Sequence, residues 1–160
     1  MPEQAEMFSL KSAYQDFVEV ILPLSDEEFL SPMDGWSPRD VVAHLVGWNS
    51  FMIEASSSIL AGKPPAYYDD APNDYSNINA GFVMKHSSRS KQELLAELES
   101  SMQAFEAFLL ALPAGELAAE HGVRHYSGSP ATVGRTVEAL AGDYRHHTRQ
   151  ISAWLHDANH

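Results

Sequence analysis

The 160-residue sequence contains no cysteine, and this absence removes several kinds of chemistry at once. No disulfide, thiolate metal site or cysteine nucleophile is possible. Basic residues are also scarce, because 10 Lys and Arg stand against 22 Asp and Glu, for a formal net charge of −12. Nucleic acids and anionic membranes attract basic faces. The composition therefore predicts no nucleic-acid partner and no membrane partner.

Long apolar runs and a secretory signal are missing as well. No stretch reaches the roughly 20 apolar residues that a membrane-spanning helix needs. The N-terminal sequence Met-Pro-Glu-Gln lacks the basic start and apolar run of a signal peptide. We therefore expect a cytoplasmic protein. Glycine-rich phosphate loops and the Gly-x-Ser-x-Gly elbow are also absent, which excludes the common nucleotide-binding and serine-hydrolase motifs.

The sequence does contain strong helical periodicity, whereas its strand signals are weak. Two helix starts are well marked. Ser37 is a good N-cap with Pro38 at the first helical position, and Ser90 forms a capping box with Glu93. We expect long helices over residues 4–22, 37–62, 90–113 and 131–156, a shorter helix over 75–86, a polar turn at 25–28, and loops over 63–75 and 113–130.

Four long amphipathic helices indicate an all-α protein built as a four-helix bundle. The short extra helix lies in the long connection between the second and third long helices. Because 160 residues is an ordinary domain size and no boundary is evident, we expect residues 1–160 to form a single domain.

Polar residues on apolar helix faces mark the candidate site, because bundle sites are built from inward side chains. His44 lies on a face beside the main apolar stripe of its helix. Asp143 and His147 are four residues apart on the last helix and share a face. An unpaired carboxylate there would cost several kcal/mol. A divalent transition metal (Zn, Ni, Fe or Mn) held by these three residues would remove that cost and leave positions open for water and substrate.

The same residues also have a metal-free interpretation, in which His44 and His147 are core histidines bonded to Asp143 or to backbone. His146 would replace His147 if the helix were rotated, although a solvated face is expected for it. Histidines of the 113–130 connection could reach over the mouth of the bundle. The aromatic residues are interpreted as core and rim; they are Trp36, Trp48, Tyr67, Tyr68 and Trp154.

Two motifs resemble those of the DinB/YfiT-like superfamily. Residues 35–49 (GWSPRDVVAHLVGWN) resemble its second-helix motif, a Trp-Ser cap followed by an apolar run and a histidine. Residues 143–151 (DYRHHTRQI) resemble its last-helix motif, His-x3-His-x2-Gln-Ile. The stretch 77–113 is similar to the ClbS/DfsB-type branch, and the resemblance extends over about residues 10–155.

The resemblance implies an up-down-down-up bundle with a metal held by three histidines. Two of these ligands fall at His44 and His147, and the third falls at Asp143. An aspartate can still bind a metal but favours a harder ion, and it could equally mark a member that has lost the metal. Asp143 is then a ligand or an orienting base.

The family's activities imply a metal-dependent enzyme that activates water or a low-molecular-weight thiol against an electrophilic small molecule, as a hydrolase or a thiol S-transferase of the detoxification type. The alternatives are a metal-free small-molecule-binding or protective protein of the same fold, as in the ClbS-type branch, and a structural dimer. We expect Trp48, Asn79 and Tyr144 to line the substrate pocket, Asn79 mainly because of the ClbS-like stretch. The resemblance also implies a homodimer, to which apolar residues left outside the main stripes would contribute.

Overall fold

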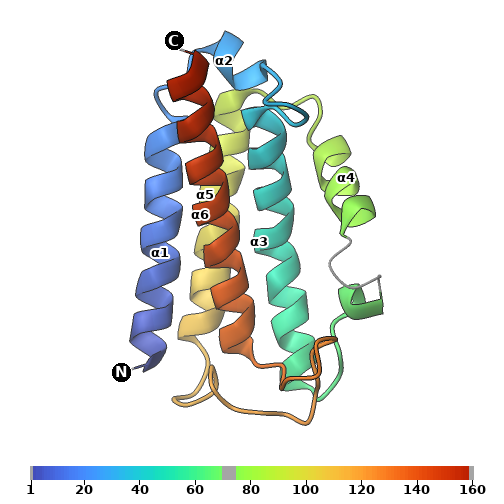
Figure 1. Cartoon of the computed structure of the whole chain (residues 1–160). Coiled ribbons are helices and arrows are strands. Elements are labelled where there is room, and N and C mark those ends of the chain that lie inside the picture. Colours follow the sequence, from blue (N-terminus) through green and yellow to red (C-terminus); the bar gives the residue numbers. More distant parts are fainter. Residues whose placement is uncertain (1, 70–74, 159–160) are drawn as a thin grey trace.

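The computed structural model describes residues 2–69 and 75–158. Four long helices form the bundle: α1 (Pro2–Ile21), α3 (Pro38–Leu60), α5 (Lys91–Leu110) and α6 (Val133–Ala158). In Figure 1, α1 runs upward, α3 and α5 run downward, and α6 returns upward. This arrangement confirms the predicted all-α, up-down-down-up bundle. No helix in the described part of the chain has both the length and the apolar character to cross a membrane.

Of the short elements, one agrees with the prediction from the sequence and two differ from it. Helix α4 (Ser76–Lys85) confirms the extra helix in the connection between α3 and α5. Residues expected to form a polar turn instead begin the one-and-a-half-turn helix α2 (Asp26–Leu30), because Ser25 and Glu28 form a capping box and Phe29 is buried. A 3-10 turn (Ala66–Asp69) occupies part of the predicted loop 63–75, whose residues 70–74 lie outside the described part.

The marked helix starts are where the sequence placed them. The Ser37 hydroxyl accepts a hydrogen bond from the Asp40 backbone N–H at 3.2 Å, and the Asp40 carboxylate accepts one from the Ser37 N–H at 3.1 Å. Ser90 and Glu93 form the same reciprocal pair at the start of α5. Each pair satisfies two backbone donors that a helix start leaves without intrahelical partners.

A buried polar contact ties three helices of the core together. The Tyr144 hydroxyl on α6 donates to Asn49 Oδ1 on α3 at 2.8 Å, and the Asn49 amide donates to Ser101 Oγ on α5 at 3.0 Å. Both Tyr144 and Asn49 are fully buried. The rings of Tyr14 and Phe17 on α1 meet Tyr144 edge-on, with centroids 5.8 and 5.5 Å away. Tyr144 is therefore a core residue that joins all four long helices.

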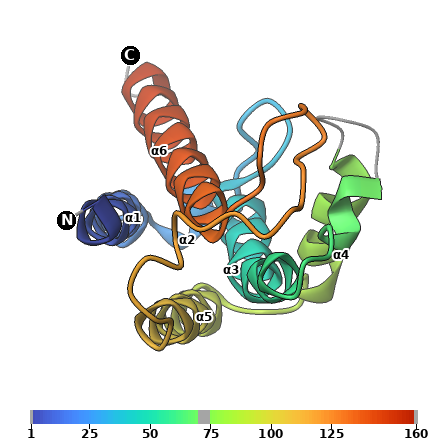
Figure 2. The same ribbon diagram turned by 90° about the horizontal axis from the view of Figure 1, so that it is seen from below.

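Helix α4 lies outside the four-helix ring and packs against α3 (Figures 1 and 2). The contact is close because α3 has a glycine, Gly47, where the two helices meet. A Cβ at this position would overlap the ring of Phe82, which α4 places directly over the α3 backbone. The docking of α4 therefore depends on a missing side chain in α3.

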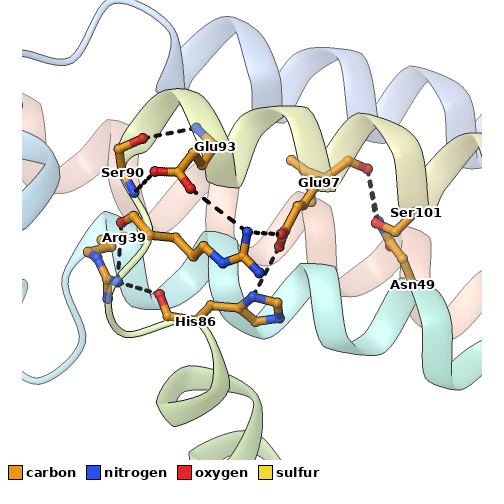
Figure 3. A network of polar contacts seen from close by, with 9 residues as sticks. Arg39, Asn49, His86, Ser90, Glu93, Glu97 and Ser101 are labelled. Atoms are coloured by element: carbon orange, nitrogen blue, oxygen red, sulfur yellow. Dashed lines mark hydrogen bonds and ion pairs between the residues drawn. The ribbon is translucent and has the colours of Figure 1, made fainter.

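A polar network fastens the C-terminal end of α4 to its neighbours (Figure 3). The buried His86 ring places Nδ1 3.0 Å from Glu97 Oε2 on α5, and Arg89 Nη1 lies 2.7 Å from Glu97 Oε1. The Arg39 guanidinium, from the first turn of α3, donates to the His86 backbone carbonyl. Burial lowers the pKa of His86, although the Glu97 carboxylate acts in the opposite direction. The folded protein therefore favours a neutral His86 imidazole.

The lowered pKa of His86 predicts a pH-dependent stability. An unfolded histidine takes up a proton near pH ~6.5, so below this pH the unfolded state binds more protons than the folded state at this position. The stability that His86 contributes is present above about pH 6.5 and is lost as the pH falls through the folded-state pKa. We expect the stability advantage of the wild type over His86→Gln, measured by urea denaturation, to be smaller at about pH 5 than at about pH 8. An advantage that grows at the lower pH would show that the pairing with Glu97 dominates.

The cap of α3 predicts a second change in stability. Replacing Ser37 by Ala removes the acceptor for the Asp40 N–H and should cost about 1 kcal/mol in the free energy of unfolding. Ser57→Ala, on the exposed face of the same helix, is the matched control and should stay within about 0.5 kcal/mol of the wild type. Equal effects of the two substitutions in urea denaturation would contradict a stabilising role for the cap.

Candidate metal centre

The structure brings together the three residues that the sequence predicted as ligands. His44 comes from α3, and Asp143 and His147 come from successive turns of α6. One ligand atom from each residue lies within 4.8 Å of the other two. His44 Nε2 is 2.9 Å from Asp143 Oδ2, and His147 Nε2 is 3.2 Å from Asp143 Oδ1. Within the described residues, this is the one such group of three metal-ligating side chains.

His147, rather than His146, belongs to this cluster. A helix turns by about 100° per residue, so positions 143 and 147 share a face and position 146 points elsewhere. The His147 side chain is buried, whereas His146 is exposed and touches the cluster only through its ring, 4.9 Å from that of His147. The alternative register considered from the sequence is therefore not the one that the helix adopts.

The hydrogen bonds of Asn79 fix the tautomer of His44. Asn79 Oδ1, on α4, lies 2.6 Å from Trp48 Nε1 and 2.9 Å from His44 Nδ1. An indole N–H can only donate, so the atom that faces Trp48 must be the amide oxygen. The same oxygen then accepts from His44, which places the hydrogen on Nδ1. The Nε2 atom of His44 is left to face Asp143, either as a lone pair or as the second N–H of an imidazolium.

His147 repeats this arrangement on α6. Its Nδ1 lies 2.8 Å from the side-chain oxygen of Gln150, to which it donates, and its Nε2 faces Asp143. A carbonyl or carboxylate oxygen that accepts from the outer nitrogen of a histidine is the usual support of a metal-binding imidazole. Gln150 lies in the last-helix motif, so the sequence contained this signal although no role was assigned to the residue.

The geometry requires positive charge between the two imidazoles and the carboxylate. If both Nε2 atoms carried only lone pairs, each would face an anionic oxygen of Asp143 without a hydrogen between them. Burial alone would raise the pKa of Asp143, but hydrogen bonds from His147 and His44 outweigh burial and hold the pKa well below its usual range. The carboxylate is therefore ionised. A proton on each imidazole or one divalent cation satisfies both contacts, and two imidazole nitrogens with one carboxylate oxygen fit such a cation.

A cavity of about 400 Å³ opens beside the cluster, and His44 and Asp143 form part of its wall. Trp48 and Asn79, which were expected to line a substrate pocket, both lie on this wall. Tyr144 does not, because its side chain points into the core and bonds to Asn49. Of the two loop histidines, His125 lines the cavity, whereas His121 pairs with Glu116 at 3.0 Å.

Several wall residues were not identified as site residues from the sequence. With Trp48, the rings of Tyr67, Tyr75 and Tyr126 form the aromatic wall. Trp36 is not a wall residue, but its ring lies against His44, with centroids 5.1 Å apart. Trp36 and Tyr67 had been interpreted as core and rim. Tyr126 lies in an irregular connection that has no periodicity to reveal its direction. Its place in the wall follows from the tertiary structure, where its hydroxyl is hydrogen-bonded to that of Tyr75.

A second cavity, of about 600 Å³, lies between α3, α4 and α5. It is the larger of the two, but its wall contains none of the three clustered ligand residues and includes instead Glu97 and the His86 ring beside it. The smaller cavity is therefore the one in which a bound molecule would contact the cluster.

Solved structures share this fold at low sequence identity. An uncharacterised protein from Escherichia coli UTI89 has a TM-score of 0.79 at 19% identity, over 98% of this chain and 94% of that one. The protein DfsB, described as a sibling lethal factor precursor, has a TM-score of 0.79 at 18% identity, over 98% and 96% of the two chains. These likenesses establish the fold.

A third similar structure corrects one expectation from the composition. It is the colibactin self-resistance protein ClbS in complex with a dsDNA, with a TM-score of 0.79 at 16% identity over 96% of this chain and 94% of that one. The prediction of no nucleic-acid partner was wrong as an exclusion, because a protein of this fold has been crystallised with DNA. The physical reason is that net charge is a sum over the whole molecule, whereas binding depends on the charge of one face.

The family follows from a match over most of the chain. No curated protein matches the sequence. The family model of the DinB superfamily matches residues 9–151, a range that includes the complete cluster of His44, Asp143 and His147. Both motifs that carried the resemblance lie within this range, at the start of α3 and in the middle of α6. The chain belongs to the DinB superfamily.

Proposed function

We propose that this protein binds a divalent transition metal through His44, Asp143 and His147 and acts on an electrophilic small molecule in the adjoining cavity, as a hydrolase or a thiol S-transferase of the detoxification type. The observation that carries the proposal is the shared orientation of the two histidines. Each donates its Nδ1 hydrogen to a side-chain amide oxygen and directs Nε2 at the same carboxylate. This is the protonation pattern in which an imidazole binds a metal.

The residues around the cluster have separable tasks in this proposal. The ion, when bound, supplies a Lewis acid that makes water or a thiol a better nucleophile near neutral pH. Asn79 and Gln150 hold the two imidazoles in the ligand tautomer. Asp143 suits the role of a ligand better than that of a general base, because a carboxylate with a strongly lowered pKa accepts a proton poorly. Trp48 and the tyrosines of the wall hold the substrate and exclude bulk water.

A metal-free protective protein is the second candidate, and a specific observation favours it. Asp143 already lies within ion-pair distance of both histidines, so the cluster contains no unpaired carboxylate when one imidazole is protonated. ClbS, whose description is that of a self-resistance protein, shares the fold. In this second reading the cavity captures or hydrolyses a toxic molecule without an ion.

Competition with a chromophoric chelator distinguishes the two candidates. Untagged wild type, Asp143→Asn and Asp143→His are titrated with Zn²⁺ and Ni²⁺. Because Asn keeps the shape of Asp but removes the anionic donor, Asp143→Asn should bind metal at least about tenfold more weakly than the wild type, a loss of about 1.4 kcal/mol. Asp143→His provides three imidazole ligands and should bind Zn²⁺ or Ni²⁺ more tightly than the wild type.

The matched control is Asp16→Asn, which makes the same change on the exposed face of α1 and should leave metal affinity unchanged. Equal affinity in all four proteins would remove Asp143 from the ligand set. Absence of metal binding in the wild type would favour the second candidate. In that case Asp143→Asn should change stability alone, by up to about 3–5 kcal/mol, because it breaks a largely buried charged pair.

A further inference from the structure

The wall of the cavity beside the cluster is made largely of aromatic rings. The Trp48 ring meets Tyr67 and Tyr75 edge-on, each at a centroid distance of 5.6 Å. The Tyr75 and Tyr126 hydroxyls are hydrogen-bonded to each other, which adds the Tyr126 ring to the same space. All four rings line the cavity. Their packing against one another gives a preformed wall, so a ligand need not order these side chains on binding.

This wall also lacks Lys and Arg, and its basic side chains are the imidazoles of His44 and His125. Among the lining residues, Asp143 is the one carboxylate, and no Lys or Arg is present in the described part of the wall. Burial raises the pKa of Tyr67, so this phenol stays neutral. Burial and the nearby charge of Arg135 lower the pKa of His125. Arg135 itself is not a wall residue, because its guanidinium donates to Ser129 and to the Pro130 carbonyl.

The second cavity differs, because its wall does contain Lys and Arg. Lys85 and Arg89 both line the larger cavity between α3, α4 and α5, where they accompany the carboxylates of Glu54 and Glu97. The chain has only 10 Lys and Arg residues, and none of those described lines the cavity beside His44 and Asp143. In the metal-free protein, an anion in the smaller cavity would lose its hydration, meet no Lys or Arg on the wall, and face a histidine charge that Asp143 already pairs.

We infer that the cavity beside His44 and Asp143 selects flat ring systems that are uncharged or cationic and discriminates against anions. Aromatic faces stack on planar ligands and attract cations through the ring quadrupole. The inference rests on the proposed function, since it assigns the substrate class of the same pocket. It also bears on the nucleophile, because a small thiol that carries carboxylates would find no Lys or Arg on this wall, whereas water carries no charge that needs such a partner. The pocket therefore favours hydrolysis over thiol transfer.

Three probes that share one ring system test the selectivity: quinoline, 1-methylquinolinium and quinoline-6-carboxylate. Binding to the full chain is measured by calorimetry near neutral pH after treatment with a chelator, so that no probe can ligate a metal ion. We expect the neutral and cationic probes to bind at least about tenfold more tightly than the carboxylate, a difference of about 1.4 kcal/mol. Equal or tighter binding of the carboxylate, or failure of all three probes to bind, would overturn the inference.

A substitution in the wall adds a second readout. Ala139 lies on α6, lines the cavity and is exposed, so Ala139→Lys places a cation at the pocket without disturbing the core. We expect this variant to bind the carboxylate probe at least about threefold more tightly than the wild type and the cationic probe more weakly. Ala107→Lys, on an exposed site of α5 away from this cavity, is the matched control. Identical behaviour of the two variants would contradict the inference.

The probe experiment and the metal titration can fail separately. The titration depends on His44, Asp143 and His147, whereas the probes depend on the aromatic wall and its lack of Lys and Arg. Probe selectivity without metal binding would leave the substrate class standing and place it in the metal-free protein. Metal binding without probe selectivity would leave the proposed centre standing and remove the assigned substrate class.

Discussion

One amide oxygen, Asn79 Oδ1, accepts hydrogen bonds from both Trp48 and His44, and the chemistry of the site depends on it. The Trp48 N–H orients the amide, and the amide then places the hydrogen of His44 on Nδ1. With that position occupied, His44 can offer only Nε2 to the space that it shares with Asp143 and His147. The cluster then needs positive charge, which either protons on the imidazoles or a metal ion can supply.

This hydrogen bond depends in turn on how α4 is docked. Asn79 belongs to a helix outside the four-helix ring, and none of its residues is fully buried. Its place against α3 results from the contact of Phe82 with Gly47 and from the network of Arg39, His86 and Glu97 at its C-terminal end. Features remote from the cluster therefore hold the group that sets the His44 tautomer. The site is assembled by the packing of α4 on the bundle.

Local patterns in the sequence were sufficient to predict the long helices and to identify the three clustered residues. The caps at Ser37 and Ser90 are signals within four residues, and the spacing of Asp143 and His147 fixes their common face. The wall of the cavity could not be predicted in this way, because Tyr126 comes from an irregular connection. Tyr144 was wrongly predicted to line the pocket. Its helical position indicated an inward residue, but whether it faces the core or the pocket depends on Asn49, which is 95 positions away in the sequence. The net charge of the whole chain likewise could not exclude a nucleic-acid partner, because such a partner contacts only one face of the molecule.

The most direct test of this account is the tautomer of His44, observed by long-range proton–nitrogen NMR correlation on ¹⁵N-labelled, chelator-treated protein and assigned by comparison with His44→Gln. The account predicts that Nδ1 of His44 carries a hydrogen in the wild type. Asn79→Leu should release this preference, while the Nδ1–H of His147 should remain. A neutral His44 protonated on Nε2 in the wild type would contradict the account, because Asp143 alone would then orient the ring and no position would be prepared for a metal.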